Sequence, residues 1–218
     1  MSSAFTALGL GFVLGIATIP SAGAATGPAT VETIVLVRHG EKPALGLGQL
    51  DCQGLNRALA LPGVIEQGFG KPTAIFAPDP AEQKDDAGRP YDYVRPLATI
   101  EPAAITFGLP VDASIGVSHI EALQTKLDAP DYRNALVLVG WEHHYIVDLS
   151  RAIVASHGGD SSLVPDWKGD DFDGIYVIRI TRTGQAATAS FERRQEGLDG
   201  QSAVCPGRSP GAATPAAK

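Results

Sequence analysis

Apolar runs separated by polar, glycine-rich and proline-rich stretches divide the chain into short elements. The runs 33–37 and 135–140 contain almost only β-branched and other apolar residues. Such uninterrupted runs are typical of strands covered on both faces, as in a parallel sheet. Shorter runs of the same kind at 73–77, 111–115 and 175–180 predict three more strands, and 189–193 predicts an edge strand.

Stretches with helical spacing lie between these runs. We expect helices at 52–61, 95–107, 120–127 and 146–156. Asp51 would cap the first helix and Pro62 would end it, while Pro102 would kink or break the second. The segment 78–93 is polar and proline-rich, and we expect a loop there. Strands that alternate with helices predict an α/β fold with a mostly parallel sheet flanked by helices on both faces.

The two ends of the chain differ from this middle part. Ala7 to Ile19 is a short apolar run followed by Ala22-Gly23-Ala24, which is typical of a secretory signal peptide over 1–24; an uncleaved anchor and a buried helix are the alternatives. We expect one domain over 25–205 and a disordered tail over 206–218, because that tail is small and proline-rich. The mature protein would be secreted or periplasmic, with no stable membrane insertion.

Charge and cysteine content narrow the choice of partners. The formal net charge of −7 argues against a general nucleic-acid binder, which would present a basic face. It does not exclude an anionic ligand in a small cleft lined by arginines. Cys52 and Cys205 can form one disulfide in an oxidising compartment, or they can be two free thiols.

Two of the predicted central strands end in histidines. Arg38-His39-Gly40 follows the first, and Glu142-His143-His144 closely follows the second. Ligands bind at the carboxyl ends of the strands in such sheets, and Arg95 at a helix start would join the same edge. A neutral imidazole is a good nucleophile toward phosphorus, and guanidinium groups hold phosphoryl oxygens.

The order of these motifs resembles the histidine phosphatase superfamily, which includes phosphoglycerate mutases and acid phosphatases. The resemblance covers about Thr33 to Ile180. Four segments carry it: Val35-Leu36-Val37-Arg38-His39-Gly40-Glu41-Lys42, Gly54-Leu55-Asn56-Arg57-Ala58, Arg95-Pro96-Leu97-Ala98-Thr99-Ile100-Glu101-Pro102, and Val137-Leu138-Val139-Gly140-Trp141-Glu142-His143.

The resemblance implies a phosphoglycerate mutase-like three-layer sandwich and a phosphomonoester hydrolase. His39 would attack phosphorus and become a phosphohistidine, while Arg38, Arg95 and His143 would bind the phosphoryl group. The substrate would be a small phosphorylated molecule. A phosphomutase and a non-catalytic phosphate- or protein-binding member of the fold are the alternatives.

The general acid is left open, because Glu142-His143-His144 matches neither the Ser-His-Gly nor the His-Asp pattern of the superfamily. Glu121 is our first candidate, since it lies between the second arginine and the last strand. Glu142, which would also contact the substrate, is an alternative, as are Glu41 and His119. If residues 141–144 continued the strand, alternation would turn His143 and His144 to opposite sides, and the motif favours His143.

We expect neither a cofactor nor a metal. Possible metal ligands are three histidines and three carboxylates: His39, His143, His144, Asp170, Asp171 and Asp173. However, the chain has no His-x-x-x-His helix and no paired thiolates. Two arginines at the same place would also repel a cation.

Overall fold

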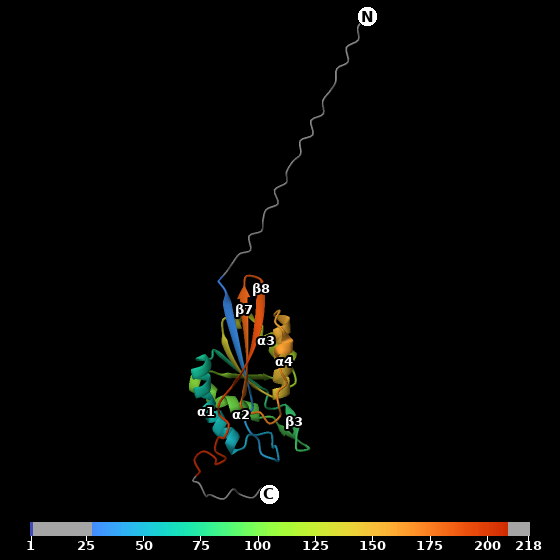
Figure 1. The fold of residues 1–218 in the computed structure, drawn as a ribbon. Coiled ribbons are helices and arrows are strands. Elements are labelled where there is room, and N and C mark those ends of the chain that lie inside the picture. Colours follow the sequence, from blue (N-terminus) through green and yellow to red (C-terminus); the bar gives the residue numbers. More distant parts are fainter. Residues whose placement is uncertain (2–27, 209–218) are drawn as a thin grey trace.

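A six-stranded sheet with helices on both faces forms the body of the protein (Figure 1). The structure is a computed structural model that describes Met1 and residues 28–208. The predicted signal peptide and most of the predicted tail lie outside the described residues. No helix of the described part combines the length and the apolarity needed to cross a membrane.

The sheet has the order β5-β2-β6-β1-β7-β8. Strands β1 (Thr30–Arg38), β2 (Ala74–Pro78), β5 (Val111–Ile115) and β6 (Leu136–Trp141) are parallel. Strands β7 (Gly174–Thr183) and β8 (Ala186–Gln195) add an antiparallel hairpin beside β1. The predicted mostly parallel α/β architecture is therefore confirmed.

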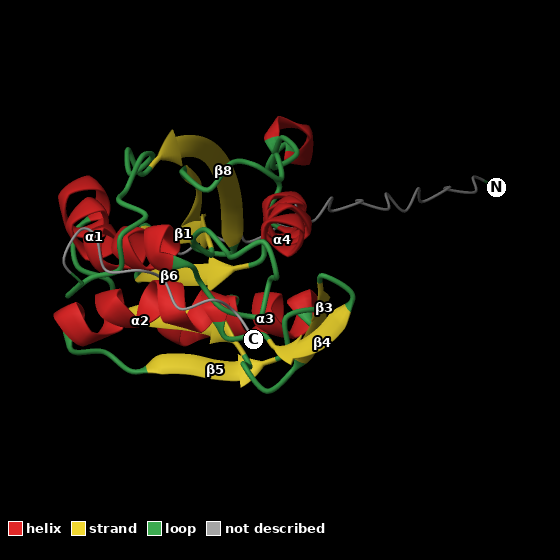
Figure 2. Ribbon diagram, turned by 90° about the horizontal axis from the view of Figure 1, so that it is seen from below, coloured by secondary structure: helices red, strands yellow, loops and turns green. Residues whose placement is uncertain are grey.

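The helices form two layers. Helices α1 (Cys52–Phe69) and α2 (Arg95–Phe107) cover one face of the sheet, and α3 (Ile120–Leu127) and α4 (His143–Ser156) cover the other (Figure 2). Along β1, Val35 and Val37 pack under α1 and α2, while Ile34 and Leu36 pack under α3 and α4. This alternation is why the central strands read as unbroken apolar runs.

Three sequence expectations about local structure were wrong. Helix α1 continues through Pro62 to Phe69, whereas α2 has its predicted bounds and contains Pro102 without a break. Proline removes one backbone donor in each helix, but Leu61 and Ile65 on either side of Pro62 are fully buried, so packing keeps α1 continuous. The predicted loop 78–93 contains a hairpin, β3 (Gln83–Asp86) and β4 (Arg89–Asp92). Helix α4 begins at His143, three residues earlier than predicted.

A disulfide joins the C-terminal end of the predicted domain to helix α1. Cys52, the first residue of α1, is joined to Cys205 by a disulfide. Asn56 supports the same segment, since its side-chain amide donates to the carbonyl oxygens of Ser202 (2.7 Å) and Val204 (2.8 Å). The disulfide is thus the alternative that the structure adopts.

Candidate functional site

The carboxyl ends of β1 and β6 bring the predicted residues together. In the parallel register Arg38 lies opposite Trp141, and the His39 amide donates to the Trp141 carbonyl oxygen at 3.1 Å. The start of α2 places Arg95 at the same edge, where its amide donates to the Gly48 carbonyl oxygen at 2.9 Å. We call Arg38, His39, Arg95, Glu142 and His143 the strand-end cluster. All five side chains are buried.

His39 has the state that a nucleophile requires. Its Nδ1 lies 2.8 Å from the Gly40 carbonyl oxygen. Because a carbonyl can only accept, Nδ1 carries the proton and Nε2 keeps its lone pair. Burial, together with the positive charges of Arg95 and Arg38, holds the pKa of His39 well below its ordinary value. The imidazole is therefore neutral at neutral pH.

Close backbone packing fixes the loop that carries His39. The Gly40 amide donates to Oγ1 of Thr99 at 2.9 Å, and that hydroxyl donates to the Arg95 carbonyl oxygen at 2.8 Å. A Cβ atom on Gly54 would meet the Glu41 carbonyl oxygen at 2.3 Å, so α1 can approach this loop only through a glycine. Asp51 caps α1 as predicted, accepting from the Gly54 amide at 2.8 Å.

The two arginines of the strand-end cluster each have partners for some of their N–H groups but not for Nε. The Arg38 guanidinium donates through Nη1 to the carbonyl oxygens of Gly169 and Asp171, both at 2.8 Å, and lies 4.0 Å from the ring centre of Phe172. Arg95 forms a short ion pair with the buried carboxylate of Asp86. The Nε atoms of Arg38 and Arg95 are buried and have no hydrogen-bond partner among the described residues.

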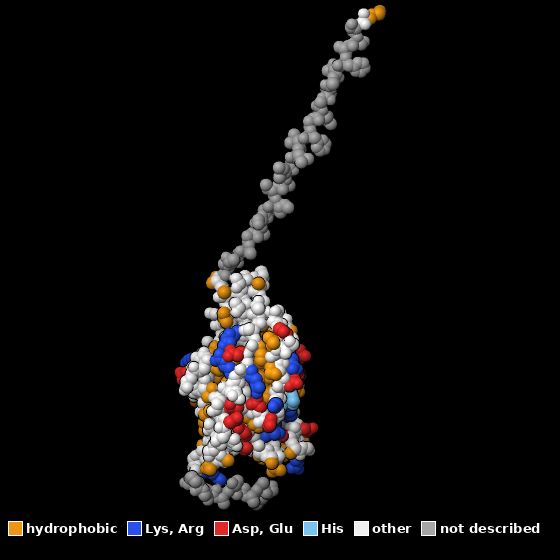
Figure 3. All heavy atoms as spheres, viewed as in Figure 1, with side chains coloured by type: hydrophobic (Ala, Val, Ile, Leu, Met, Phe, Trp, Pro, Cys, Tyr) orange, Lys and Arg blue, Asp and Glu red, His pale blue; other side chains and the backbone are white. Residues whose placement is uncertain are grey.

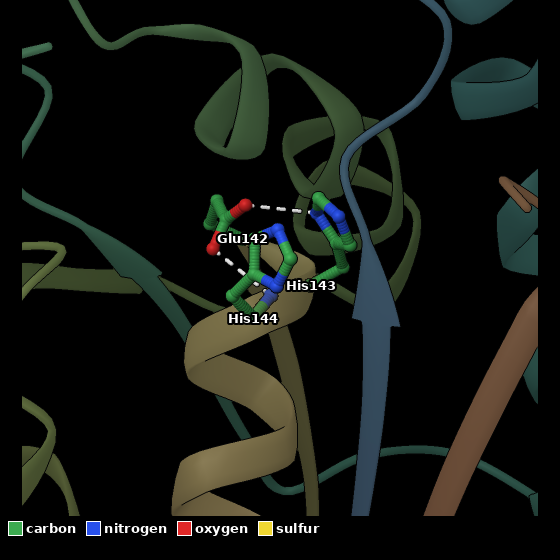
Figure 4. A group of neighbouring side chains, drawn as sticks. All are labelled: Glu142, His143 and His144. Carbon is green, nitrogen blue, oxygen red and sulfur yellow. Dashed lines mark hydrogen bonds and ion pairs between the residues drawn. The ribbon is translucent and has the colours of Figure 1, made fainter. Parts of the chain in front are cut away.

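Glu142 organises the first turn of α4 (Figure 4). As the N-cap it accepts from the amides of His144 (3.0 Å) and Tyr145 (3.2 Å). Its Oε1 lies 2.8 Å from Nδ1 of His143, although this contact lacks the alignment of a good hydrogen bond. Burial raises the pKa of Glu142, but His143, Lys84 and the backbone amides outweigh it and lower that pKa to about 2. Glu142 is therefore a carboxylate that orients His143.

His143 and not His144 lies in the strand-end cluster, but for a different reason from the strand alternation that we predicted. His143 and His144 both lie on the first turn of α4, so strand alternation does not apply to them. His143 is buried in the cluster, whereas His144 is exposed and its ring lies 4.0 Å from that of His143. The structure thus brings His143 to the site and leaves His144 at its edge.

The candidates for the general acid lie in unequal positions. Glu121 and His119 are exposed at the start of α3, and no described contact joins either to the strand-end cluster. Glu41 is bound through both carboxylate oxygens by the Arg57 side chain at 2.8–3.1 Å. Glu142 lies in the cluster but is ionised.

Several residues of the site carried no readable sequence signal. The β3–β4 hairpin supplies Asp86, which pairs with Lys42 (2.7 Å) and Arg95, and Lys84, whose Nζ lies 3.8 Å from Glu142 Oε1. Tyr93 and Phe172 contact the His39 ring, with ring centres 6.0 and 6.1 Å away. Asp86, Lys84, Tyr93 and Phe172 lie outside the four recognised motifs, although Asp86 is only nine residues before Arg95.

A cation site is disfavoured here. Glu142, His143 and His144 offer three ligand atoms within 4.8 Å of one another. However, Lys84 already lies against Glu142, and one carboxylate oxygen of Glu142 is engaged by backbone amides. The acidic run predicted as an alternative ligand set is also engaged: Asp173 contacts Arg57 at 3.1 Å and Asp171 contacts Arg193 at 2.6 Å.

Comparison with solved structures identifies the fold. A mycobacterial glucosyl-3-phosphoglycerate phosphatase in complex with inorganic phosphate superposes with a TM-score of 0.52 at 13% identity, over 74% of this chain and 95% of that one. Mycobacterial hydrolase 2 gives 0.51 at 13% identity, over 74% and 89%. A protein named as the phosphohistidine phosphatase SixA of Nakamurella multipartitia gives 0.50 at 16% identity, over 78% and 98%.

These similarities establish the fold and leave the activity open. No family model matches the sequence, and no curated protein matches it either. The chain has the fold found in histidine phosphatases, in agreement with the resemblance of its motifs.

Proposed function

We propose that this protein is a phosphomonoester hydrolase that works through a phosphohistidine intermediate on His39. One observation carries the proposal: a buried, neutral imidazole lies beside two guanidinium groups, and neither its Nε2 nor their Nε donors have a hydrogen-bond partner within residues 28–208. Buried donors without partners are costly, and a phosphoryl group would satisfy them.

The charges around the strand-end cluster suit a phosphate dianion. Arg38, Arg95, Lys42 and Lys84 face the carboxylates of Asp86 and Glu142. Asp171 also lies near Arg38, but its charge is balanced by an ion pair with Arg193. The resulting surplus of two positive charges would be neutralised by one phosphomonoester dianion. This local surplus contrasts with the chain's net charge of −7, so attraction of the substrate would be confined to the cleft.

The reaction balances in two steps. Nε2 of His39 attacks phosphorus, the bond from phosphorus to the ester oxygen breaks, and that oxygen takes up one proton. A water oxygen then attacks phosphorus, the phosphorus–nitrogen bond breaks, and the water gives up one proton. Arg38 and Arg95 would stabilise the equatorial oxygens in both steps, where charge develops.

A substrate can reach His39 only if the residues that cover its imidazole move. The imidazole lies between the rings of Tyr93 and Phe172, and it is only 3% exposed. Phe172 is half-buried and lies shortly after the exposed run 168–170, so its segment can move at less cost than the core.

A second function, phosphate or protein binding without turnover, is favoured by the state of the acid candidates. Glu142 is ionised, Glu41 is bound to Arg57, and Glu121 and His119 contact nothing in the cluster. A site that binds the anion but cannot protonate a leaving group would release no product. A phosphomutase, the remaining alternative, would transfer the phosphoryl group to a second hydroxyl instead of water.

The experiment is release of phosphate from 4-nitrophenyl phosphate, with His39→Ala and His144→Ala beside the wild type and a chelator in a parallel sample. We expect turnover that His39→Ala abolishes, that the chelator leaves intact, and that His144→Ala changes little. No turnover between pH 4 and 9 (about 2.5 units on either side of the usual histidine pKa), together with phosphate binding that depends on Arg38, would favour the binding function. Loss of activity with the chelator would contradict the metal-free mechanism.

We also propose that the protein acts outside the cytoplasm and recognises a small phosphorylated substrate. The Cys52–Cys205 disulfide supports the first point, since such bonds persist in oxidising compartments. Acidic and basic side chains are interspersed on the face drawn in Figure 3, which supports a small-molecule substrate over nucleic acid.

A further inference from the structure

The hydroxyl group of Tyr93 is buried at the site without a hydrogen-bond partner. Tyr93 lies between β4 and α2, two residues before Arg95, and is 1% exposed. Among the described residues its oxygen forms no hydrogen bond of good geometry, although the Arg95 side chain lies close enough to lower the pKa of the hydroxyl. A phenylalanine of the same shape would avoid the free-energy cost of burying this hydroxyl without a good hydrogen bond. The hydroxyl is thus costly to the free protein.

The surroundings of Tyr93 are those of the reacting group. Its ring and the His39 imidazole form a T-shaped pair with an interplanar angle of 88°. The Arg95 guanidinium lies 4.6 Å from the ring centre, and Lys84 Nζ lies 5.2 Å from it. Tyr93 therefore touches the nucleophile and one of the two phosphoryl-binding arginines at once.

The hydroxyl can act only as a donor toward an anion. Burial raises the pKa of Tyr93 above its ordinary value, although the nearby charges of Arg95 and Arg38 oppose this. The group stays protonated across the range in which His39 is neutral. A protonated phenol beside two cationic groups is suited to donating a hydrogen bond to an oxyanion.

We propose that Tyr93 is a further catalytic residue, whose hydroxyl donates a hydrogen bond to an equatorial oxygen of the phosphoryl group during its transfer to and from His39. The inference rests on the proposed function. With the Nε groups of Arg38 and Arg95, it completes a set of three buried unpartnered donors at one place. No bond of Tyr93 forms or breaks in this role, so the two-step balance is unchanged.

The test compares Tyr93→Phe with Tyr91→Phe. Tyr91 lies on β4, two residues before Tyr93, is half-buried, and has no described side-chain contact with the strand-end cluster. For each protein, kcat and KM for 4-nitrophenyl phosphate, the Kd for inorganic phosphate and the melting temperature are measured. We expect Tyr93→Phe to melt at or above the wild-type temperature while kcat/KM falls about 10- to 100-fold and phosphate binds more weakly. Tyr91→Phe should stay within about twofold of the wild type, within ordinary surface-mutation effects.

The outcomes separate the two proposals. If Tyr93→Phe keeps both its kcat/KM and its phosphate Kd within about twofold of wild type, a difference too small for a lost charge-assisted hydrogen bond, the role of Tyr93 is refuted. If it melts well below the wild type with an unchanged phosphate Kd, the hydroxyl is structural and the role is also refuted. If the wild type binds phosphate without turnover and Tyr93→Phe binds it more weakly, the hydrolase fails and Tyr93 stands as an anion-binding residue. If the wild type neither binds nor hydrolyses phosphate, both proposals fall.

Discussion

Replacing Arg57 by methionine tests how the loop behind His39 is held. Arg57 is fully buried in α1, and its guanidinium contacts Glu41 (2.8 Å), Asp173 (3.1 Å) and Glu196 (2.6 Å). A fourth partner, Asp199, is exposed and contributes little. Methionine fills much of the same volume but leaves three carboxylates around an apolar side chain. Removing one partner of a buried ion pair costs about 3–5 kcal/mol of unfolding free energy.

That loss should appear as a large shift in melting temperature. For a domain of this length, each kcal/mol lowers the melting temperature by roughly 2–4 °C, so Arg57→Met should melt roughly 6–20 °C below the wild type. The matched control is Arg194→Met, because Arg194 is partly exposed and its pair with Glu192 lies at the surface. Loss of such a surface pair costs about 0–1 kcal/mol.

The pH dependence gives the prediction its sign. Burial raises the pKa of Glu196 to about 8 even though Arg57 opposes the shift. A carboxyl whose pKa is higher in the folded protein contributes stability below its unfolded pKa of about 4.3, and this contribution is lost as the pH rises through its folded pKa. Without Arg57 the folded pKa of Glu196 rises further, so the penalty of Arg57→Met should be larger at pH 8 than at pH 5.

Urea denaturation at pH 5 and pH 8 measures both effects. The double variant Arg57→Met/Glu196→Gln should recover part of the loss at pH 8, because it removes one of the stranded carboxylates. A penalty below about 1 kcal/mol, the size of a surface pair, would refute the reasoning. A penalty that does not grow from pH 5 to pH 8 would also refute it.

Three further outcomes are expected. Gly54→Ala should lose about 1–3 kcal/mol of stability by overpacking, because its Cβ would meet the Glu41 carbonyl oxygen at 2.3 Å. In thermal melts, the control Gly63→Ala in the same helix should be neutral or stabilising, because its Cβ meets only one side-chain atom, at 4.0 Å. The acid limb of kcat/KM for a 4-nitrophenyl phosphate substrate should lie below the histidine reference of about 6.5, since burial lowers the pKa of His39 and only the neutral ring attacks; a limb above that value would contradict the assignment. Reduction of the Cys52–Cys205 disulfide, which spans 153 residues, should lower the unfolding free energy by about 2–5 kcal/mol. Denaturation with and without a reductant measures this, and the reductant should not change the unfolding free energy of a Cys52→Ser/Cys205→Ser variant.

The sequence predicted the elements whose apolar pattern is local. The bounds of α2, β5 and α3 agree with the predicted ranges, because in each case the periodic pattern begins and ends within the element itself. The error at Pro62 has the opposite origin. Pro62 disfavours a helix locally, but α1 buries Ala58, Leu61 and Ile65 against the sheet, and this packing outweighs the local penalty.

Part of the candidate site could also be predicted from the sequence. Parallel strands place their carboxyl ends at one edge, so residues just after β1 and β6 must be neighbours, and His39 and His143 follow from that rule. Glu142 was recognised as a site residue, but its ionised state was not predictable, because it depends on Lys84 from the distant hairpin and on the turn of α4.

The sequence by itself thus determined the α/β sheet, the edge where chemistry-bearing residues gather, and the nucleophile candidate. Only the tertiary structure decided that Arg57 joins the His39 loop to Glu196 just after β8, that the β3–β4 hairpin brings Asp86 to Arg95, and that Tyr93 has, among the described residues, a hydroxyl without a good hydrogen bond near His39. Strand and helix patterns arise from the periodic burial of neighbouring residues. Pairing of buried charges and donors arises between segments distant in the chain, and no local pattern encodes it.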